Sequence, residues 1–263
     1  MKIAIVTGAS SGMGREFIMQ IADRFNGIGE IWAIARRQAR MDELSPLVPV
    51  RLRTFPLDLT DEQNLRKLQE ILSEEKPEVK WLIGAAGYGK IGATGSVSRA
   101  DEAGMLDLNC KALCAVTHMV LPYMTDNSRI IQFSSAAAFL PQPNFAVYAA
   151  TKSFVLSYSR ALHEELKPRG ICVTAVCPGP VKTEFFTVAE TTGQIPFYKR
   201  IVMADPARVV RLALRDSMMG RPLSVYGTTI KTFRILCKLV PHNVILPLIR
   251  GLTQVRKGRS CSR

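Results

Sequence analysis

A phenol and an ammonium group stand one helical turn apart in the second half of the chain. Tyr148 and Lys152 are four positions apart, so a helix over this stretch places both side chains on one face. A free phenol has a pKa of about 10, and a neighbouring ammonium lowers that pKa because it stabilises the phenolate. The pair is therefore suited to proton transfer, although pairs at this spacing also arise by chance.

Other polar residues precede this pair. Ser134 and Ser135 end the apolar run 129–134, and Asn109 lies in the helical pattern before that run. Each has an ordinary structural explanation, since a serine can end a strand, an asparagine can bond to helix backbone and a lysine can be surface charge. Taken together with Tyr148 and the lysine, they favour a catalytic interpretation.

A glycine-rich turn near the start of the chain is typical of a dinucleotide site. The apolar run 2–7 ends in Thr7-Gly8-Ala9-Ser10-Ser11-Gly12-Met13-Gly14, where the helical pattern 12–25 begins. Such glycines let the backbone approach a pyrophosphate, which is attracted by the free N–H groups and positive dipole end of the following helix. We interpret this turn as cofactor-binding through Gly8, Ser10, Ser11, Gly12, Met13 and Gly14.

The residues after the second apolar run bear on which dinucleotide is bound. The run 30–35 is followed by Arg36 and Arg37 and by no acid. An NAD site usually has an acid here to bond the ribose 2′-hydroxyl, whereas guanidinium groups suit a 2′-phosphate. The sequence therefore favours NADP(H), with a solvated loop of surface arginines as the alternative.

The elements that must position these residues alternate along the chain. Apolar runs typical of strands lie at 2–7, 30–35, 52–56, 80–84, 129–134, 171–177 and 222–226. Helical patterns lie at 12–25, 61–75, 99–124, 147–167 and 205–219. Strands rich in Val, Ile and Leu that alternate with helices form parallel sheets covered on both faces. We expect an α/β fold, a doubly wound, Rossmann-like parallel sheet of about seven strands. The dinucleotide-binding and catalytic domain would span 1–228, with 229–263 as its extension.

Length and composition exclude several classes. The 263 residues suffice for one domain with a large core, and 47% hydrophobic and 22% charged residues are typical of a globular protein. The six cysteines form no CxxC pair, which argues against zinc and a disulfide framework and for buried, reduced thiols. With no leader pattern and no apolar run of about 18 residues, we expect a cytoplasmic protein that does not span a bilayer.

The net charge of +13 is concentrated near the C-terminus. Residues 221–263 contain nine Lys and Arg and no acid, whereas 1–220 contain 26 basic and 22 acidic residues. This distribution argues against a nucleic-acid-binding protein, since no recognised motif accompanies the charge.

An amphipathic helix is expected over 229–240, before Pro241. Its basic stripe is Lys231, Arg234 and Lys238, and its apolar side is Ile230, Phe233, Leu236, Cys237, Leu239 and Val240. Such a helix can make peripheral contact with an anionic membrane surface. It can also pack on the body, close the substrate pocket or form a subunit contact.

Six motifs in order resemble the short-chain dehydrogenases/reductases in their compact single-domain form. The resemblance covers residues 2–227. It rests on the Thr7–Gly14 turn, Asp58-Leu59, Asn109, Ser135, the Tyr148/Lys152 pair and Pro178-Gly179-Pro180-Val181-Lys182-Thr183. It implies an NADP(H)-dependent oxidoreductase that interconverts a ketone and a secondary alcohol by hydride transfer, assembled as a homodimer or homotetramer.

The resemblance also implies residue roles. Tyr148 would be the general acid and base, Lys152 would bind the nicotinamide ribose, and Ser135 would donate to the substrate oxygen. Asn109 would hold a water in the proton relay. Asp58 would bond the adenine amino group. The other cofactor contacts implied are Leu59, Ala86, Gly87, Pro178, Gly179, Val181 and Thr183, besides Tyr148 and Lys152.

One motif departs from the family pattern. Relatives have Asn-Asn-Ala-Gly after the fourth strand, whereas this chain has Gly84-Ala85-Ala86-Gly87. Only the last two residues match. Because the asparagines stabilise the central sheet in relatives, their loss puts local packing in doubt more than chemistry.

The substrate is expected to be hydrophobic, such as a steroid, a bile acid or a fatty-chain ketone. The residues expected around it are Tyr88, Phe139, Leu140, Phe145, Phe185, Phe186, Ile195, Phe197 and Tyr198. The alternative is that these side chains pack in the hydrophobic core and contact no substrate. An anionic substrate is the other possibility, because Lys182, Lys199 and Arg200 could bind its charge.

The alternative function is a non-enzymatic NADP(H)-sensing or membrane-associated binding protein on the same fold, which the intact Tyr148 and Lys152 disfavour.

Overall fold

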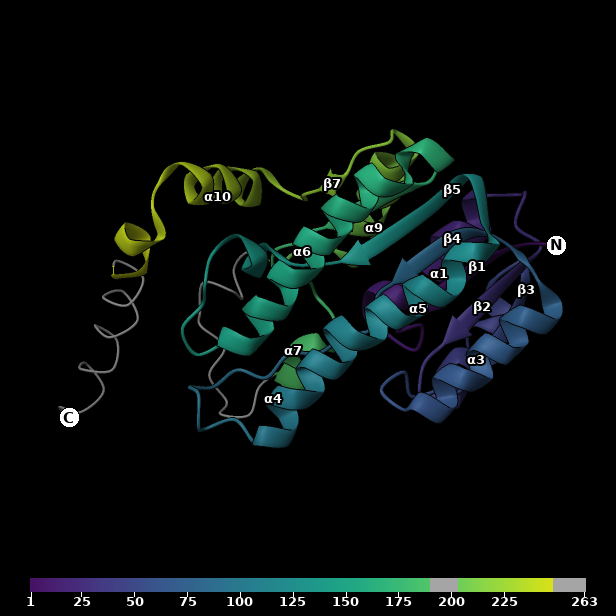
Figure 1. The fold of residues 1–263 in the computed structure, drawn as a ribbon, viewed down its shortest axis with the longest axis horizontal. Coiled ribbons are helices and arrows are strands. Elements are labelled where there is room, and N and C mark those ends of the chain that lie inside the picture. The colour runs from purple at the N-terminus through teal and green to yellow at the C-terminus, as the bar shows by residue number, and fades with distance from the viewer. Residues whose placement is uncertain (190–202, 248–263) are drawn as a thin grey trace.

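The computed structural model describes residues 1–189 and 203–247, and these contain one sheet of seven parallel strands (Figure 1). The strands are β1 (Lys2–Thr7), β2 (Glu30–Ile34), β3 (Arg51–Phe55), β4 (Glu78–Gly84), β5 (Met124–Phe133), β6 (Cys172–Val176) and β7 (Leu223–Ser224). Their order in the sheet is β3-β2-β1-β4-β5-β6-β7. The chain adds β2 and β3 on one side of β1 and then crosses back to add β4 to β7 on the other side, so the strand order reverses between β1 and β4. The expected doubly wound, Rossmann-like sheet is confirmed.

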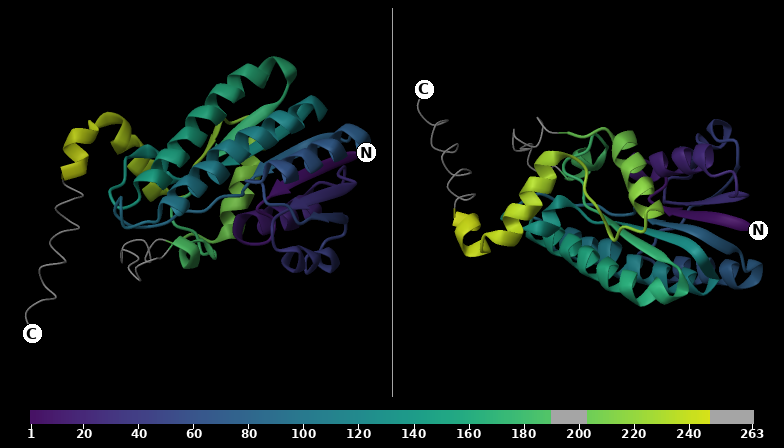
Figure 2. Two further views of the ribbon diagram at one scale, coloured as in Figure 1. Left: turned by 60° about the horizontal axis from the view of Figure 1, so that its bottom comes forward. Right: turned by 90° about the horizontal axis from the view of Figure 1, so that it is seen from above.

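Helices cover both faces of the sheet, as Figure 2 shows from above. One face carries α1 (Gly12–Arg24) and α9 (Pro206–Met218). The other carries α3 (Glu62–Glu75), α5 (Leu113–Val120) and α6 (Ala146–Leu166). Further α-helices are α2 (Gln38–Asp42), α4 (Arg99–Leu106), α7 (Phe185–Ala189) and α10 (Thr228–Leu239).

The apolar runs explain why helices lie on both sides. Every residue of β2 and of β6 is buried. Because successive side chains of a strand point to opposite faces, each run contributes to two cores. In β1, Val6 belongs to the cluster of Phe17 and Val210, and Ile5 belongs to the opposite cluster with Leu68. Burial on both faces therefore fixes the layered arrangement.

The expected helix 99–124 is interrupted. Between α4 and α5 the backbone forms a π-helical turn over Asp107–Ala112. Such a turn widens the helix by one residue and changes the direction of the side chains around it. Asn109 lies in this turn and is fully buried. The interruption therefore places a side chain that a regular helix would direct elsewhere.

The expected C-terminal helix is present as α10, and residues 242–247 are also helical after Pro241. In both views of Figure 2, α10 lies at the end of the molecule remote from the N-terminus. Within the two described stretches, no helix combines the length and apolar character that crossing a bilayer requires.

The cysteines of the described residues are free thiols. Cys172, Cys177 and Cys237 are buried, and Cys110 and Cys114 are partly buried. Burial raises the pKa of Cys177 to about 12, so it stays protonated at neutral pH. The expectation of reduced thiols fits these five residues.

Candidate active site

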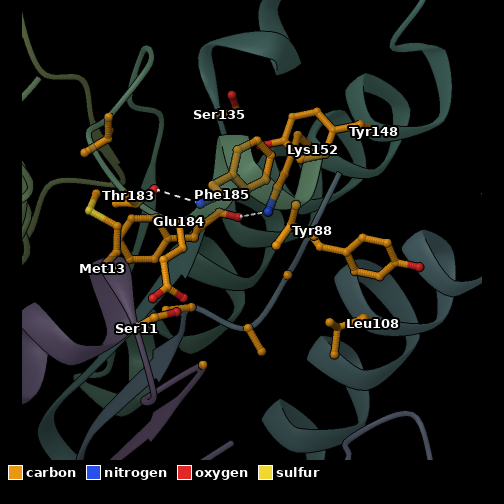
Figure 3. A pocket seen from close by; sticks show the side chains of 18 of the residues that line it. Ser11, Met13, Tyr88, Leu108, Ser135, Tyr148, Lys152, Thr183, Glu184 and Phe185 are labelled. Carbon is orange, nitrogen blue, oxygen red and sulfur yellow. Dashed lines mark hydrogen bonds between the residues drawn. The ribbon is translucent and has the colours of Figure 1, made fainter. Parts of the chain in front are cut away.

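A cavity of about 710 Å³ opens beyond the carboxyl ends of the central strands. Its walls come from the β1–α1 turn, the segments that follow strands β2 to β6, and the start of α6. Figure 3 shows Ser11, Tyr88, Ser135, Tyr148 and Thr183 from several of these segments. In open parallel sheets, ligands bind where the strand order reverses, which here is between β1 and β4. The cavity lies at this position.

Glycines shape the turn after β1 for close backbone approach. Gly8 and Gly12 have φ angles of +67° and +52°. A Cβ on Gly8 would lie 2.7 Å from the Ala85 carbonyl oxygen, and one on Gly14 would overlap the Gly8 carbonyl. The turn is thus drawn tightly against β4 and α1. At the start of α1, the side chain of Ser11 caps none of the helix N–H groups, so this cradle fits an anionic pyrophosphate.

Two arginines border the cavity beside this turn. Arg37 donates from Nε and Nη2 to Ser10 Oγ at 3.3 Å, and its Nη2 lies 3.0 Å from a carboxylate oxygen of Glu184. Arg36 Nη1 lies 3.8 Å from Asp58 Oδ2, with its side chain 75% exposed. Arg36 is therefore accessible to a ligand at the end of β2.

Tyr148 lies in the first turn of α6 with its ring at the cavity wall. Its ring stacks on Phe145 with centroids 4.2 Å apart, and Ser135 lines the same cavity. Phe185 lies at 5.3 Å from the same ring. Burial raises the pKa of the phenol, and the Ser135 side chain opposes that rise in part.

Lys152 lies one turn further along α6, also at the cavity wall (Figure 3). Its Nζ donates to the Phe133 carbonyl oxygen at 2.7 Å and lies 5.6 Å from the centroid of the Tyr148 ring. Burial lowers the pKa of Lys152 to about 8. The expected lowering of the phenol pKa is wrong for the protein alone: the pKa of Tyr148 is raised, because burial dominates and the Lys152 ammonium is bound to the Phe133 carbonyl of β5.

Asn109 lies behind the cavity wall. Its Oδ1 accepts from Tyr88 N at 3.0 Å, and its Nδ2 donates to Tyr88 O and Thr151 Oγ1 at 2.9 and 3.1 Å. A Cβ on Gly87 would lie 2.8 Å from Asn109 Oδ1 and 3.4 Å from Lys152 Nζ. Asn109 therefore ties the loop after β4 to α6.

The structure shows what surrounds Gly84-Ala85-Ala86-Gly87, the motif at the end of β4 that departs from the family pattern. A side chain on Gly84 would collide with the buried side chain of Gln132, whose Nε2 donates to Thr117 Oγ1 at 2.9 Å. Thr7 Oγ1 accepts from Ala86 N at 3.2 Å and joins β1 to β4. Gln132 and Thr7 thus fill and bridge the region around Gly84-Ala85-Ala86-Gly87.

The cavity brings together most of the residues that the sequence singles out. Those lining it are Gly8, Ser10, Ser11, Gly12, Met13, Arg36, Arg37, Asp58, Leu59, Ala86, Gly87, Ser135, Tyr148, Lys152, Pro178, Gly179, Val181 and Thr183. Gly14 and Asn109 do not line it, because Gly14 packs on the turn and Asn109 is covered by the loop after β4.

The expected substrate residues divide into three groups. Tyr88, Phe145, Phe185 and Phe186 line the cavity. Phe139 and Leu140 do not, because they pack with Cys237 of α10. Lys182, expected for an anionic substrate, does not line it either. The others lie outside the described residues, namely Ile195, Phe197, Tyr198, Lys199 and Arg200.

Some lining residues carried no signal in the sequence. Glu184, Lys90 and Gln142 border the cavity, and Glu184 pairs with Arg37 across 147 positions of sequence. No local spacing predicts such a contact, since it depends on how the loop after β6 meets the end of β2. The acidic side chain after Thr183 was the one available hint.

Comparison with protein families establishes the class. A family model described as short chain dehydrogenase matches residues 2–193. The chain therefore belongs to the short-chain dehydrogenases/reductases and is an oxidoreductase of that family, as the six motifs indicated.

Similar proteins differ in the substrates that their names state. Sulfoacetaldehyde reductase 2 of Chromohalobacter salexigens is 36% identical over 200 residues, covering 73% of this chain and 77% of that protein. Very-long-chain 3-oxoacyl-CoA reductase-B of Danio rerio is 30% identical over 98% of this chain and 82% of its own length. The structure of a bulky-bulky ketone specific alcohol dehydrogenase from Comamonas testosteroni matches with a TM-score of 0.70 and 26% identity, covering 100% of this chain and 95% of that one.

Proposed function

We propose that this oxidoreductase interconverts a ketone and a secondary alcohol with NADP(H), using Tyr148 as general acid and base. The observation that carries the proposal is that Tyr148, Ser135 and Lys152 line one cavity together with the glycine-rich turn. Two hydroxyl groups that line one cavity can both donate to the carbonyl oxygen of a substrate bound there.

The residues of the chain would handle the proton and the negative charge of the reaction. When bound, NADPH supplies a hydride to the carbonyl carbon. Ser135 donates a hydrogen bond to the carbonyl oxygen as negative charge develops there, and Tyr148 transfers its phenolic proton to the same oxygen. Because burial raises the pKa of Tyr148, the phenol holds its proton at neutral pH and is ready for reduction.

Lys152 and Asn109 would support that proton transfer. Lys152 Nζ faces the Tyr148 ring at 5.6 Å, so an ammonium there stabilises the phenolate left after transfer. Its pKa of about 8 means that it gives up a proton readily. Asn109 fixes the Tyr88 backbone, and the second lone pair of its Oδ1 is available to a water of the relay.

The preference for NADP(H) is supported by the charge at the end of β2. Arg36 is largely exposed at the cavity rim, and Arg37 is held against Ser10 of the phosphate-binding turn. Guanidinium groups match the geometry and charge of a 2′-phosphate. Asp58 is the nearby acid, but it is engaged by Thr60 and Arg36.

A bulky, hydrophobic carbonyl substrate is supported by the aromatic side of the cavity. The Phe145, Tyr148 and Phe185 rings form a continuous apolar wall, and Phe186 contacts Phe185 edge to face at 5.5 Å. Two of the similar proteins are named for very-long-chain 3-oxoacyl-CoA and bulky ketones. The aldehyde named for the third defines the competing substrate class.

The proposal is tested by following the loss of nicotinamide absorbance over a panel of carbonyl compounds. The panel should include small aldehydes, sulfoacetaldehyde, aliphatic 3-oxo esters and thioesters, and steroid ketones, each with NADPH and with NADH. We expect turnover of the bulky apolar members with NADPH. Turnover of sulfoacetaldehyde alone would reject the apolar substrate class. A panel without turnover, together with intact NADPH binding, would instead favour a non-enzymatic NADP(H)-binding protein.

A further inference from the structure

Helix α10 has one side packed on the body of the protein. Ile230 lies on Gly179, where a Cβ would be 2.7 Å from Ile230 Cδ1. One turn and two turns further, Phe233 and Cys237 pack with Leu140 after the 3-10 turn Ala136–Phe139. This side of α10 is therefore explained by contacts within the chain.

The opposite side of α10 presents apolar side chains to solvent. Ile235 is 57% exposed, Leu236 is 48% exposed and Leu239 is 75% exposed. Successive residues of a helix are about 100° apart, so Ile235 and Leu239 lie on one row, with Leu236 beside them. Three large apolar side chains are thus gathered on one exposed face, unlike singly scattered surface residues.

Basic side chains flank this exposed face. Lys231 lies one turn before Ile235 on the same row, and Arg234 and Lys238 lie on the adjoining row. All three are exposed, and none is in an ion pair among residues 1–189 and 203–247. In the sequence, the segment 221–263 has nine basic residues and no acid, so no acid of the segment itself neutralises them.

We propose that the exposed face of α10 docks on the surface of a lipid bilayer that contains anionic phospholipids. The helix lies parallel to the surface, with Ile235, Leu236 and Leu239 in the interfacial region. Lys231 and Lys238 extend their ammonium groups to lipid phosphates while their methylene stems cover apolar surface. The 12 residues of α10 are too few to span a bilayer, so the contact is peripheral.

The charge favours a bilayer over a second copy of this chain. Two copies joined through this face by a two-fold axis would bring two sets of basic side chains together, and like charges across an interface are unfavourable. An anionic surface instead complements all three basic residues of α10. Since α10 begins against Gly179, which also lines the cavity, docking would hold one wall of the cavity close to the lipid.

The proposal is tested by co-sedimentation of the full chain with vesicles. Vesicles of phosphatidylcholine with about 30% phosphatidylserine are compared with pure phosphatidylcholine, at about 0.1 M and 0.5 M salt. We expect binding to the anionic vesicles only, and less of it at high salt. Lys231→Gln/Lys238→Gln should weaken binding about thirtyfold, and Ile235→Ser/Leu239→Ser should weaken it at least about tenfold.

Matched control variants carry the same chemical changes elsewhere. Arg66→Gln/Lys67→Gln removes two exposed charges from α3, and Met218→Ser/Met219→Ser removes two exposed apolar side chains near the end of α9. Both should bind vesicles like the unmodified chain. NADPH binding by every variant serves as the folding check, which separates this test from that of the proposed activity.

Three results would overturn the proposal. The first is equal binding to neutral and anionic vesicles, or none to either. The second is vesicle binding that the α10 variants leave unchanged, which would assign it to other basic residues. The third is a stable dimer in solution that Ile235→Ser/Leu239→Ser dissociates, which would show that a second copy covers this face.

Discussion

The surroundings of Tyr148 and the outer face of α10 are built in opposite ways. Tyr148 is 7% exposed and is stacked on Phe145, with Phe185 beside its ring and Lys152 fixed by the Phe133 carbonyl. On α10, by contrast, Leu239 is 75% exposed. Groups that must meet a reacting atom are held by several contacts at once, whereas a face meant for an external partner makes few contacts within the chain.

The largest expected change in stability comes from breaking the tightly held side of this comparison at the glycine-rich turn after β1. Gly8→Ala should lower the free energy of unfolding by about 2 to 4 kcal/mol and abolish NADPH binding, because φ is positive and a Cβ meets the Ala85 carbonyl. Gly95→Ala is the matched control, since Gly95 also has a positive φ but no atom within 4 Å. It should cost only about 1 kcal/mol in denaturant unfolding. An equal loss of unfolding free energy in the two variants would contradict the steric clash at Gly8.

A second test concerns the buried ammonium of Lys152. Burial lowers its pKa from 10.5 to about 8, so the unfolded chain binds more protons than the folded chain between these pH values. The free energy of unfolding should therefore rise with pH in this window, by on the order of 2 kcal/mol relative to Lys152→Met. Denaturant unfolding of both proteins from about pH 7 to pH 10 measures this difference. Parallel curves would show that the charge of Lys152 is not penalised by burial.

A third and smaller effect concerns the cavity rim. Arg36→Asp should shift the ratio of NADPH to NADH affinity towards NADH by about tenfold to a hundredfold, because an exposed guanidinium is replaced by a group that repels a 2′-phosphate. Arg40→Asp in α2 makes the same charge change and should leave the ratio unaltered. The two affinities can be measured by titration of each cofactor. An unchanged ratio in Arg36→Asp would remove this residue from the phosphate site.

The smallest expected change in stability concerns the exposed face of α10, the loosely held side of the comparison. Leu239→Ser should change the free energy of unfolding by less than about 0.5 kcal/mol, because the side chain is 75% exposed. Phe233→Ser, on the packed side of the same helix, should cost clearly more, since Phe233 contacts the cluster of Leu140 and Cys237. Thermal unfolding of the two variants provides the measurement. A larger loss in Leu239→Ser would mean that the outer face is part of the fold.

Most of the fold was predictable because it follows from local patterns. Parallel strands are buried on both faces, so β1, β2 and β6 read as continuous apolar runs with clear ends. The interruption of 99–124 was not predictable, because a π-helical turn keeps the composition of a helix. The direction of the pKa shift of Tyr148 was also missed, since it depends on burial that only the packed structure shows.

The site was predictable where spacing alone brings side chains together. Tyr148 and Lys152 share a helix face, and the glycine-rich turn is contiguous in sequence. The pairing of Glu184 with Arg37 joins the loops after β6 and β2, and the packing of Leu140 on α10 joins the segment after β5 to that helix. Contacts of this kind depend on the assembled sheet, so neither could be read from the sequence.

The most direct test of the proposed mechanism is the turnover of Tyr148→Phe. With a carbonyl substrate that the unmodified chain reduces, the variant should lose about a hundredfold to ten-thousandfold in kcat, because it lacks the proton donor. Its NADPH affinity should stay within about threefold, since only one hydroxyl group is removed. Turnover equal to that of the unmodified chain, at equal NADPH affinity, would contradict the role of Tyr148 as the general acid.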